Sequence, residues 1–355
     1  MTEQKRVEWL DVARGLGMLL VIIGHTMTTP IRQASFSAYA VYNAVYFFHM
    51  PFMFYLSGRT FGMFRQRNCS YTPGVWIKKK WNTLMVPYLV YGVLVYLIFC
   101  LANCQEKLHE ILEEAGYGTQ SVFQWVYGAV IGDNLYTYHL WFIYALFLMN
   151  VFVYFLFRYG RYQKVLLFVL AFVCIGARVY VNTSNWGIAN LFMKCFLWFV
   201  VGTFFDFSKI VKKSWAIVWM CFGIVYMVVY AGQLWDAIWK LPPIMQEMVK
   251  WVADVGILLF FVGLSMKLAG AVKQFFVFTG RNSFGIYLFH QPFFASGGGL
   301  VLYKVLGLPL VAAIVLTFIL CYIGPIVILK CFDMPYLRGC KKYLLGLPTK
   351  KVDKR

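Results

Sequence analysis

Two ionisable residues share one apolar segment near the start of the chain. Arg14 and His25 lie eleven positions apart in RGLGMLLVIIGH, and the stretch from Val12 to Thr29 is otherwise almost wholly apolar. Placing an ionisable group in hydrocarbon costs roughly 2–3 kcal/mol or more, so such residues usually persist for function. On a helix, eleven steps of about 1.5 Å separate the pair by roughly 16 Å along the axis, on broadly the same face. The spacing predicts a cation near one membrane surface and a proton-handling group inside the membrane.

Each member of this pair allows two interpretations. Neutral imidazole can accept a proton from a hydroxyl near pH 7, so His25 is a candidate general base. The alternative is a histidine that only hydrogen-bonds a neighbouring helix. Arg14 could bind phosphate oxygens through its two-pronged guanidinium. It could instead form an ion pair at the membrane surface with Asp11, which lies three residues earlier on the same helix face.

Two further apolar segments carry histidines. In YFFHMPFMFYLSGRTFG, His49 lies near the middle and next to Pro51, which should perturb the helix and free backbone carbonyls. Arg59 lies near the end of this segment and could bind an anion or extend to the membrane surface. His290 lies in SFGIYLFHQP and is also followed by a proline. We treat His25, His49 and His290 as candidate catalytic residues. We expect no metal, because there is no HExxH motif and no acidic residue beside any of the three.

A run of lysines precedes another apolar segment. The sequence WIKKKWNTLMVPY contains Lys78, Lys79 and Lys80. These side chains could hold a phosphorylated cytosolic ligand, or they could contact lipid headgroups and set topology.

Composition identifies the class of protein. Of 355 residues, 61% are hydrophobic and only 13% are charged, against about a quarter in ordinary globular proteins. The net charge of +19 would suggest nucleic-acid binding in a soluble protein. Here the basic residues lie in the gaps between apolar segments, so membrane topology explains them and we expect no nucleic-acid partner.

Apolar windows predict an all-α, polytopic transmembrane helical bundle with about ten spans. The expected limits are 10–28, 37–62, 82–103, 137–158, 163–182, 188–206, 214–232, 250–268, 281–300 and 308–332. The even-numbered gaps are strongly basic and the odd ones are not, which predicts both termini in the cytoplasm. Arg14 then lies on the cytoplasmic side and His25 in the outer half. We expect one transmembrane domain, 1–340, and a basic cytoplasmic tail, 341–355.

These segments together resemble the integral-membrane acyltransferase 3 family, in its sugar O-acetyltransferase branch. EWLDVARGLGMLLVIIGH is similar to the opening signature of that family, with a basic residue, ten residues and a histidine. FFHMPFMFYLSG resembles its second span, LWFIYALF its Trp-Phe motif and SFGIYLFHQP its late-span motif. Many members carry two arginines three apart before the third span, where this chain has Lys80 and Thr83.

The resemblance implies acyl transfer from cytosolic acyl-CoA, with acetyl-CoA as the expected donor, to a hydroxyl of a cell-surface glycan or glycolipid sugar. It implies that His25 acts as base or acyl carrier. The cations expected to hold the phosphates of the donor are Arg14, Arg59, Lys78, Lys79 and Lys80. A multi-pass protein of the cell membrane is expected, whose partners are acyl-CoA, the acceptor and the bilayer; a homo-oligomer stays open.

Two other classes compete with this interpretation. Histidines in spans and a proline-perturbed helix also suit a transporter or flippase for a glycan or lipid-linked sugar. Such transporters often contain inverted repeats, and none is detectable in this sequence. A structural or sensory membrane protein would leave the intramembrane histidines unexplained.

Overall fold

The computed structural model describes residues 7–181, 185–235, 240–337 and 339–346. Within these ranges every regular element is a helix and no β-strand occurs, which confirms the all-α prediction. Among the described helices, six are long and apolar enough to cross a membrane. They are α1 (Glu8–Thr26), the continuous helix Pro73–Asn103, the helix Tyr138–Tyr159, α10 (Gln163–Tyr180), α14 (Pro243–Lys267) and α16 (Leu310–Cys331).

Each of the ten expected spans overlaps a helix. The expected 37–62 corresponds to α3 (Phe36–Met63), and two others correspond to the shorter α11 (Ile188–Phe204) and α13 (Trp215–Ala231). The ninth span differs from the expected 281–300. Here α15 (Gly270–Phe289) begins earlier and is followed by the π-helical η4 (His290–Gly297). The backbone breaks at Gln291 (φ −117°, ψ 153°), because a residue before proline is disfavoured in the helical region.

The described chain forms two compact units. The first contains the chain up to residue 63 together with 195–323, and the second contains 64–194 and the chain from 324 onward. Residues 347–355 of the expected basic tail lie outside the described residues.

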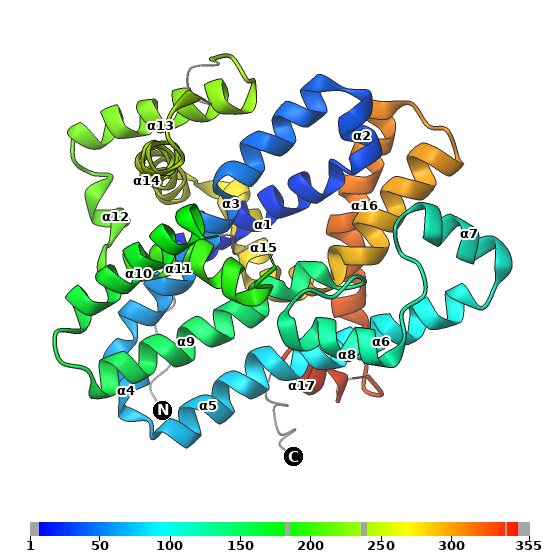
Figure 1. Cartoon of the computed structure of the whole chain (residues 1–355), viewed down its shortest axis with the longest axis horizontal. Helices are drawn as coiled ribbons and strands as arrows, with labels where there is room; N and C mark the ends of the chain where they lie inside the picture. The colour runs from blue at the N-terminus through cyan, green and yellow to red at the C-terminus, as the bar shows by residue number, and fades with distance from the viewer. Residues whose placement is uncertain (1–6, 182–184, 236–239, 338, 347–355) are drawn as a thin grey trace. The chain divides into compact units, whose positions relative to one another are not determined.

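In the first unit, α1 packs against α15, α3 and α14 (Figure 1). The α1–α15 contact is backbone to backbone at two glycines. A Cβ on Gly15 would collide with the carbonyl of Phe276, and a Cβ on Gly280 would collide with the carbonyl of Asp11. Small residues allow such close helix packing in membranes. This approach places the start of α1 directly against the middle of α15.

Two other helix pairs of this unit also pack backbone to backbone at glycines. Gly58 of α3 and Gly202 of α11 each face a backbone carbonyl of the opposite helix. Gly223 and Gly256 do the same between α13 and α14. Tight packing of this kind holds α3 and α14 in defined registers, which matters because both carry polar residues inside the membrane.

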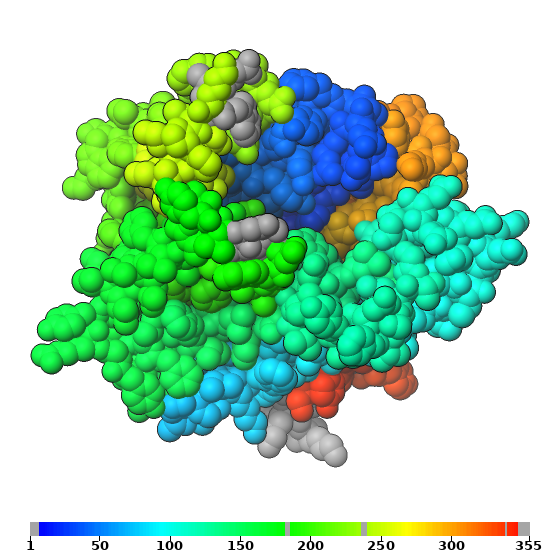
Figure 2. Space-filling model, viewed as in Figure 1, coloured from blue at the N-terminus to red at the C-terminus, as the bar shows by residue number. Residues whose placement is uncertain are grey.

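The second unit contains a long helix interrupted by a π-helical turn. α5 (Pro73–Lys80) continues through η1 (Trp81–Met85) into α6 (Val86–Asn103), and α9 (Trp141–Tyr159) packs against α5 and η1. After α6 comes α7 (Glu106–Glu114). None of its side chains is buried, and Figure 2 shows this segment at the surface. The capping box of Ser121 and Gln124 begins α8 (Val122–Ile131).

Short elements complete the described chain. They are α2 (Thr29–Ala34), α4 (Arg65–Ser70), η2 (Tyr138–Leu140), α12 (Phe207–Ile210), η5 (Leu300–Val305) and α17 (Cys340–Leu344).

Candidate active site

The three histidines singled out in the sequence come together in the first unit. The ring centroid of His25 lies 5.1 Å from that of His290 and 6.0 Å from that of Tyr46. The ring of Tyr46 in turn lies 4.7 Å from that of His49. Helix α1, helix α3 and the C-terminal end of α15 therefore each contribute one histidine to a single aromatic and polar cluster.

His25 is held through one ring nitrogen. Its Nδ1 accepts a hydrogen bond from the Nε2 amide of Gln291 at 3.2 Å, and the hydroxyl of Tyr46 lies 3.4 Å from the same nitrogen. The hydroxyl of Ser296 donates to Oε1 of Gln291 at 2.8 Å. A chain of hydrogen bonds thus runs from Ser296 through Gln291 to His25.

The other two histidines are bound differently. Nδ1 of His49 donates to the carbonyl of Val45 at 2.8 Å, and Nδ1 of His290 donates to the carbonyl of Tyr287 at 2.6 Å. A neutral imidazole that donates from Nδ1 carries its lone pair on Nε2. Both rings are buried, whereas His25 is only partly buried. Of the three, His25 is therefore the one that a substrate reaches most readily.

The backbone carbonyl that Pro51 leaves without a helical partner in α3 is bound from α14. Pro51 has no N–H, so the carbonyl of Phe47, four residues earlier, lacks its helical partner. The ammonium of Lys250 donates to this carbonyl at 2.8 Å. The same ammonium forms an ion pair with Asp254, one turn further along α14, at 2.9 Å. The expectation that Pro51 frees a backbone carbonyl is thus confirmed, and an intramembrane ion pair satisfies that carbonyl.

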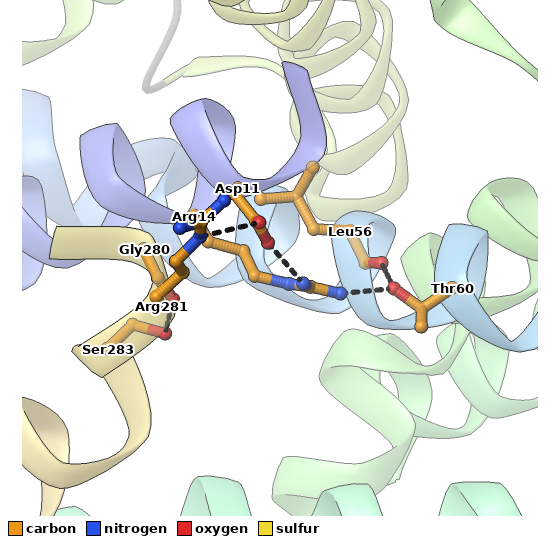
Figure 3. A network of polar contacts seen from close by, with 7 residues as sticks. All are labelled: Asp11, Arg14, Leu56, Thr60, Gly280, Arg281 and Ser283. Atoms are coloured by element: carbon orange, nitrogen blue, oxygen red, sulfur yellow. Dashed lines mark hydrogen bonds and ion pairs between the residues drawn. The ribbon is translucent and has the colours of Figure 1, made fainter. Parts of the chain in front are cut away.

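At the other end of α1, two arginines share one carboxylate (Figure 3). Nη1 of Arg14 lies 3.2 Å from Oδ1 of Asp11, and Nε of Arg281 lies 3.6 Å from Oδ2 of Asp11. Nη2 of Arg14 also donates to the hydroxyl of Thr60 at 2.6 Å, and that hydroxyl donates to the carbonyl of Leu56. The predicted pairing of Asp11 and Arg14 is confirmed. Two guanidinium groups against one carboxylate leave a net positive charge at this end of the helix.

Arg59 is engaged by a carboxylate elsewhere in the unit. Its Nη2 lies 2.5 Å from Oδ2 of Asp206, whose other oxygen accepts from the backbone N–H and the hydroxyl of Ser208. A phosphate at Arg59 would have to compete with this carboxylate. Donor binding by Arg59 stays a prediction from the sequence.

The lysine run lies in the second unit, at the end of α5. Lys78 and Lys79 are exposed, and the ammonium of Lys79 lies 4.6 Å above the ring of Tyr71. The ammonium of Lys80 lies 4.7 Å above the ring of buried Trp76. These cation–π contacts orient the side chains of Lys79 and Lys80. Donor binding by Lys78, Lys79 and Lys80 stays a prediction from the sequence.

Several site residues were not singled out in the sequence. Gln291 and Tyr46 lie beside recognised histidines, but their importance depends on which helix each one faces. Lys250 and Asp254 had a readable signal, because they lie four residues apart and Asp254 falls inside an apolar span. Arg281 lies at the first position of the expected ninth span and was not singled out. Among the residues that the structure describes, no group of three or more His, Cys, Asp or Glu side chains could hold a metal ion.

Comparison with known proteins identifies the family. The acyltransferase 3 family model, described as an acyltransferase domain, matches residues 7–329. Neither a curated protein nor a solved structure matches the chain. The family match spans both compact units and contains every residue of the histidine cluster, and it favours acyl transfer over glycan transport. This chain is therefore a membrane acyltransferase and belongs to the acyltransferase 3 family.

Proposed function

We propose that this acyltransferase moves an acetyl group from acetyl-CoA to a hydroxyl of a cell-surface glycan or glycolipid sugar. In this proposal the chain is a multi-pass protein of the cell membrane, and His25 is the general base. The observation that carries the proposal is the cluster of His25, Tyr46 and His290 inside the helical bundle, on the helix that also bears Arg14. A partly buried imidazole within hydrogen-bond range of polar groups suits proton transfer from a hydroxyl.

The proposed reaction has two proton transfers and one acyl transfer. His25 accepts the proton of the acceptor hydroxyl as its oxygen attacks the thioester carbonyl, forming a tetrahedral intermediate. The intermediate collapses, the carbon–sulfur bond breaks and the CoA thiolate leaves. The thiolate then takes the proton from the imidazolium, which returns His25 to its neutral form. In the acyl-carrier variant, the imidazole itself attacks the thioester, the carbon–sulfur bond breaks, and the CoA thiolate leaves with the ring N–H proton. The acceptor oxygen then displaces the imidazole from the acyl group, and the imidazole takes the hydroxyl proton.

The start of α1 is the proposed place for the phosphates of the donor. Arg14 and Arg281 supply guanidinium groups that bind phosphate oxygens well. Asp11 holds both arginines by one carboxylate, so an incoming phosphate would join an existing cationic cluster. Arg14 and His25 are about 16 Å apart along the continuous helix α1, a span that a long pantetheine arm can bridge.

The test uses membrane vesicles from cells that express the full chain, supplied with acetyl-CoA labelled in the acetyl group. Label in the glycan and glycolipid fraction is measured against vesicles that lack the chain. His25→Ala should lower transfer about 10²- to 10⁴-fold, the usual contribution of a general base. His109→Ala, which removes a histidine of α7 outside the cluster, should leave transfer unchanged. Full transfer by His25→Ala would refute the proposed role.

The same vesicles distinguish the two roles of His25. The reaction is quenched rapidly under conditions that do not hydrolyse an acetyl group from the imidazole. If His25 acts only as a base, the quenched protein should carry no acetyl label. Label on the wild-type protein that disappears in His25→Ala would favour the acyl-carrier variant.

A further inference from the structure

Gln291 occupies a special position in the first unit. It lies at the break between α15 and the rest of η4, with a non-helical backbone, and its side chain is buried. The break turns its carboxamide toward α1, where Nε2 meets Nδ1 of His25 at 3.2 Å. The hydroxyl of Ser296, one turn onward, holds the other end of the carboxamide. A buried amide bound at both ends is well placed to orient what it touches.

This contact gives His25 a different tautomer from its neighbours. Because the amide N–H of Gln291 donates to Nδ1, the proton of neutral His25 lies on Nε2 and its lone pair on Nδ1. His49 and His290 donate from Nδ1 to backbone carbonyls, so their lone pairs lie on Nε2. A base must present its lone pair to the hydroxyl it deprotonates, so the tautomer decides which nitrogen of His25 can react.

We propose that Gln291 is a positioning residue for His25, which orients the imidazole and assigns its neutral tautomer, with Ser296 fixing the amide. The proposal rests on the proposed role of His25 as general base. Nδ1 has a single lone pair, so the acceptor hydroxyl takes the place of the amide N–H at Nδ1, and Nδ1 then receives the hydroxyl proton. After the transfer, the amide can turn so that Oε1 accepts from the new Nδ1–H. Because the hydroxyl of Ser296 can donate or accept, the chain of hydrogen bonds survives this turn.

Two substitutions of similar size separate positioning from packing. Gln291→Met removes the polar contact, and we expect kcat to fall about 10- to 100-fold with KM for acetyl-CoA unchanged, the range seen when the partner that orients a metal-binding histidine is lost. Gln291→Glu offers only acceptor oxygens, so Nδ1 must carry a proton to pair with it. The added negative charge favours the protonated ring, and the acidic limb of the pH–rate profile should move to higher pH by about 1 unit or more.

Other titratable groups near His25 are the same in all variants. Tyr46 faces it from α3, with His49 beyond, and His290 faces it from the end of α15. On α14, Lys250 and Asp254 pair with each other. Gln246→Met removes a partly buried carboxamide of α14 that donates to the carbonyl of Leu241. This control should leave both kcat and the pH–rate profile unchanged.

A spectroscopic measurement tests the tautomer without any acceptor. The full chain, labelled with ¹⁵N-histidine and reconstituted in lipid nanodiscs, gives separate nitrogen signals for the two tautomers, and His25→Ala identifies those of His25. We expect neutral His25 to carry its proton on Nε2 in the wild type and on Nδ1 in Gln291→Glu. The same tautomer in both proteins would overturn the inference.

The outcomes distinguish the two proposals. Wild-type transfer by His25→Ala refutes the general-base proposal, whatever Gln291 does. If His25→Ala is inactive while Gln291→Met keeps its kcat and Gln291→Glu keeps the wild-type pH profile, only the positioning role is wrong.

Discussion

The ion pair of Lys250 and Asp254 leads to a quantitative prediction about stability. Lys250→Met keeps the aliphatic part of the side chain and removes its charge. The substitution takes the ammonium away from Asp254, whose side chain is 0% exposed, and from the carbonyl of Phe47. That carbonyl cannot regain a helical partner, because residue 51 is proline. One substitution therefore disturbs a buried carboxylate and a buried carbonyl together.

The magnitude follows from these two losses. Removing one partner of a buried ion pair costs about 3–5 kcal/mol. The side chain of Lys250 is 24% exposed, which places this pair at the lower end of that range. An unsatisfied buried carbonyl adds about 1–3 kcal/mol. Since Lys250 serves both groups at once and the losses overlap, we expect the free energy of unfolding to fall by about 3 kcal/mol.

Reversible unfolding in mixed detergent micelles measures this change, and two second-site variants separate its parts. In the Lys250→Met background, Asp254→Asn removes the buried charge and should recover about 1–2 kcal/mol. Pro51→Ala restores an N–H that can donate to the carbonyl of Phe47, and it should recover about 1 kcal/mol. Lys267→Met, at an exposed lysine of the same helix, should change stability little. A Lys250→Met protein within about 0.5 kcal/mol of the wild type would refute the reasoning.

Three further predictions concern packing, donor binding and thiol reactivity. Gly280→Ala should lower the free energy of unfolding by about 1–3 kcal/mol, because its Cβ would collide with the carbonyl of Asp11. Gly176→Ala is the control, because the space around Gly176 is open, and equal stabilities of the two variants would contradict the packing argument. Arg14→Ala should raise KM for acetyl-CoA about 10-fold or more, because it removes a charge-assisted contact to a phosphate of the donor. Arg32→Ala is the charge-matched control, and an unchanged KM in Arg14→Ala would rule out phosphate binding by Arg14. Burial raises the pKa of the Cys69 thiol more than Arg65 and Arg158 lower it. In detergent-solubilised protein at pH 7, Cys69 should therefore react with maleimide more slowly than exposed Cys104, and its rate should rise between pH 7 and pH 9. Equal rates of the two thiols at pH 7 would contradict this prediction.

The helices were predictable because each depends on a local property of the chain. An apolar run long enough to cross a bilayer must satisfy its own backbone hydrogen bonds, and a helix does so without partners. Contacts within one helix were predictable for the same reason, as with Asp11 and Arg14 three residues apart. The freed carbonyl before Pro51 could also be anticipated, since it follows from the missing N–H of proline. The position of the break in the ninth span could not be predicted, because Pro51 and Pro325 lie inside continuous helices and a proline alone therefore does not mark a break.

The sequence by itself determined which ionisable residues lie inside apolar spans, among them His25, His49 and His290, and that basic residues lie in the gaps between spans. The tertiary structure decided their partners. Gln291 reaches His25 across 266 positions, Lys250 reaches Phe47 across 203, and Arg59 reaches Asp206 across 147. Such contacts depend on how glycine-lined helices approach and rotate against each other, which no local pattern specifies. The chemistry proposed for His25 is therefore readable from the chain, while the group that orients its imidazole is visible only in the packed bundle.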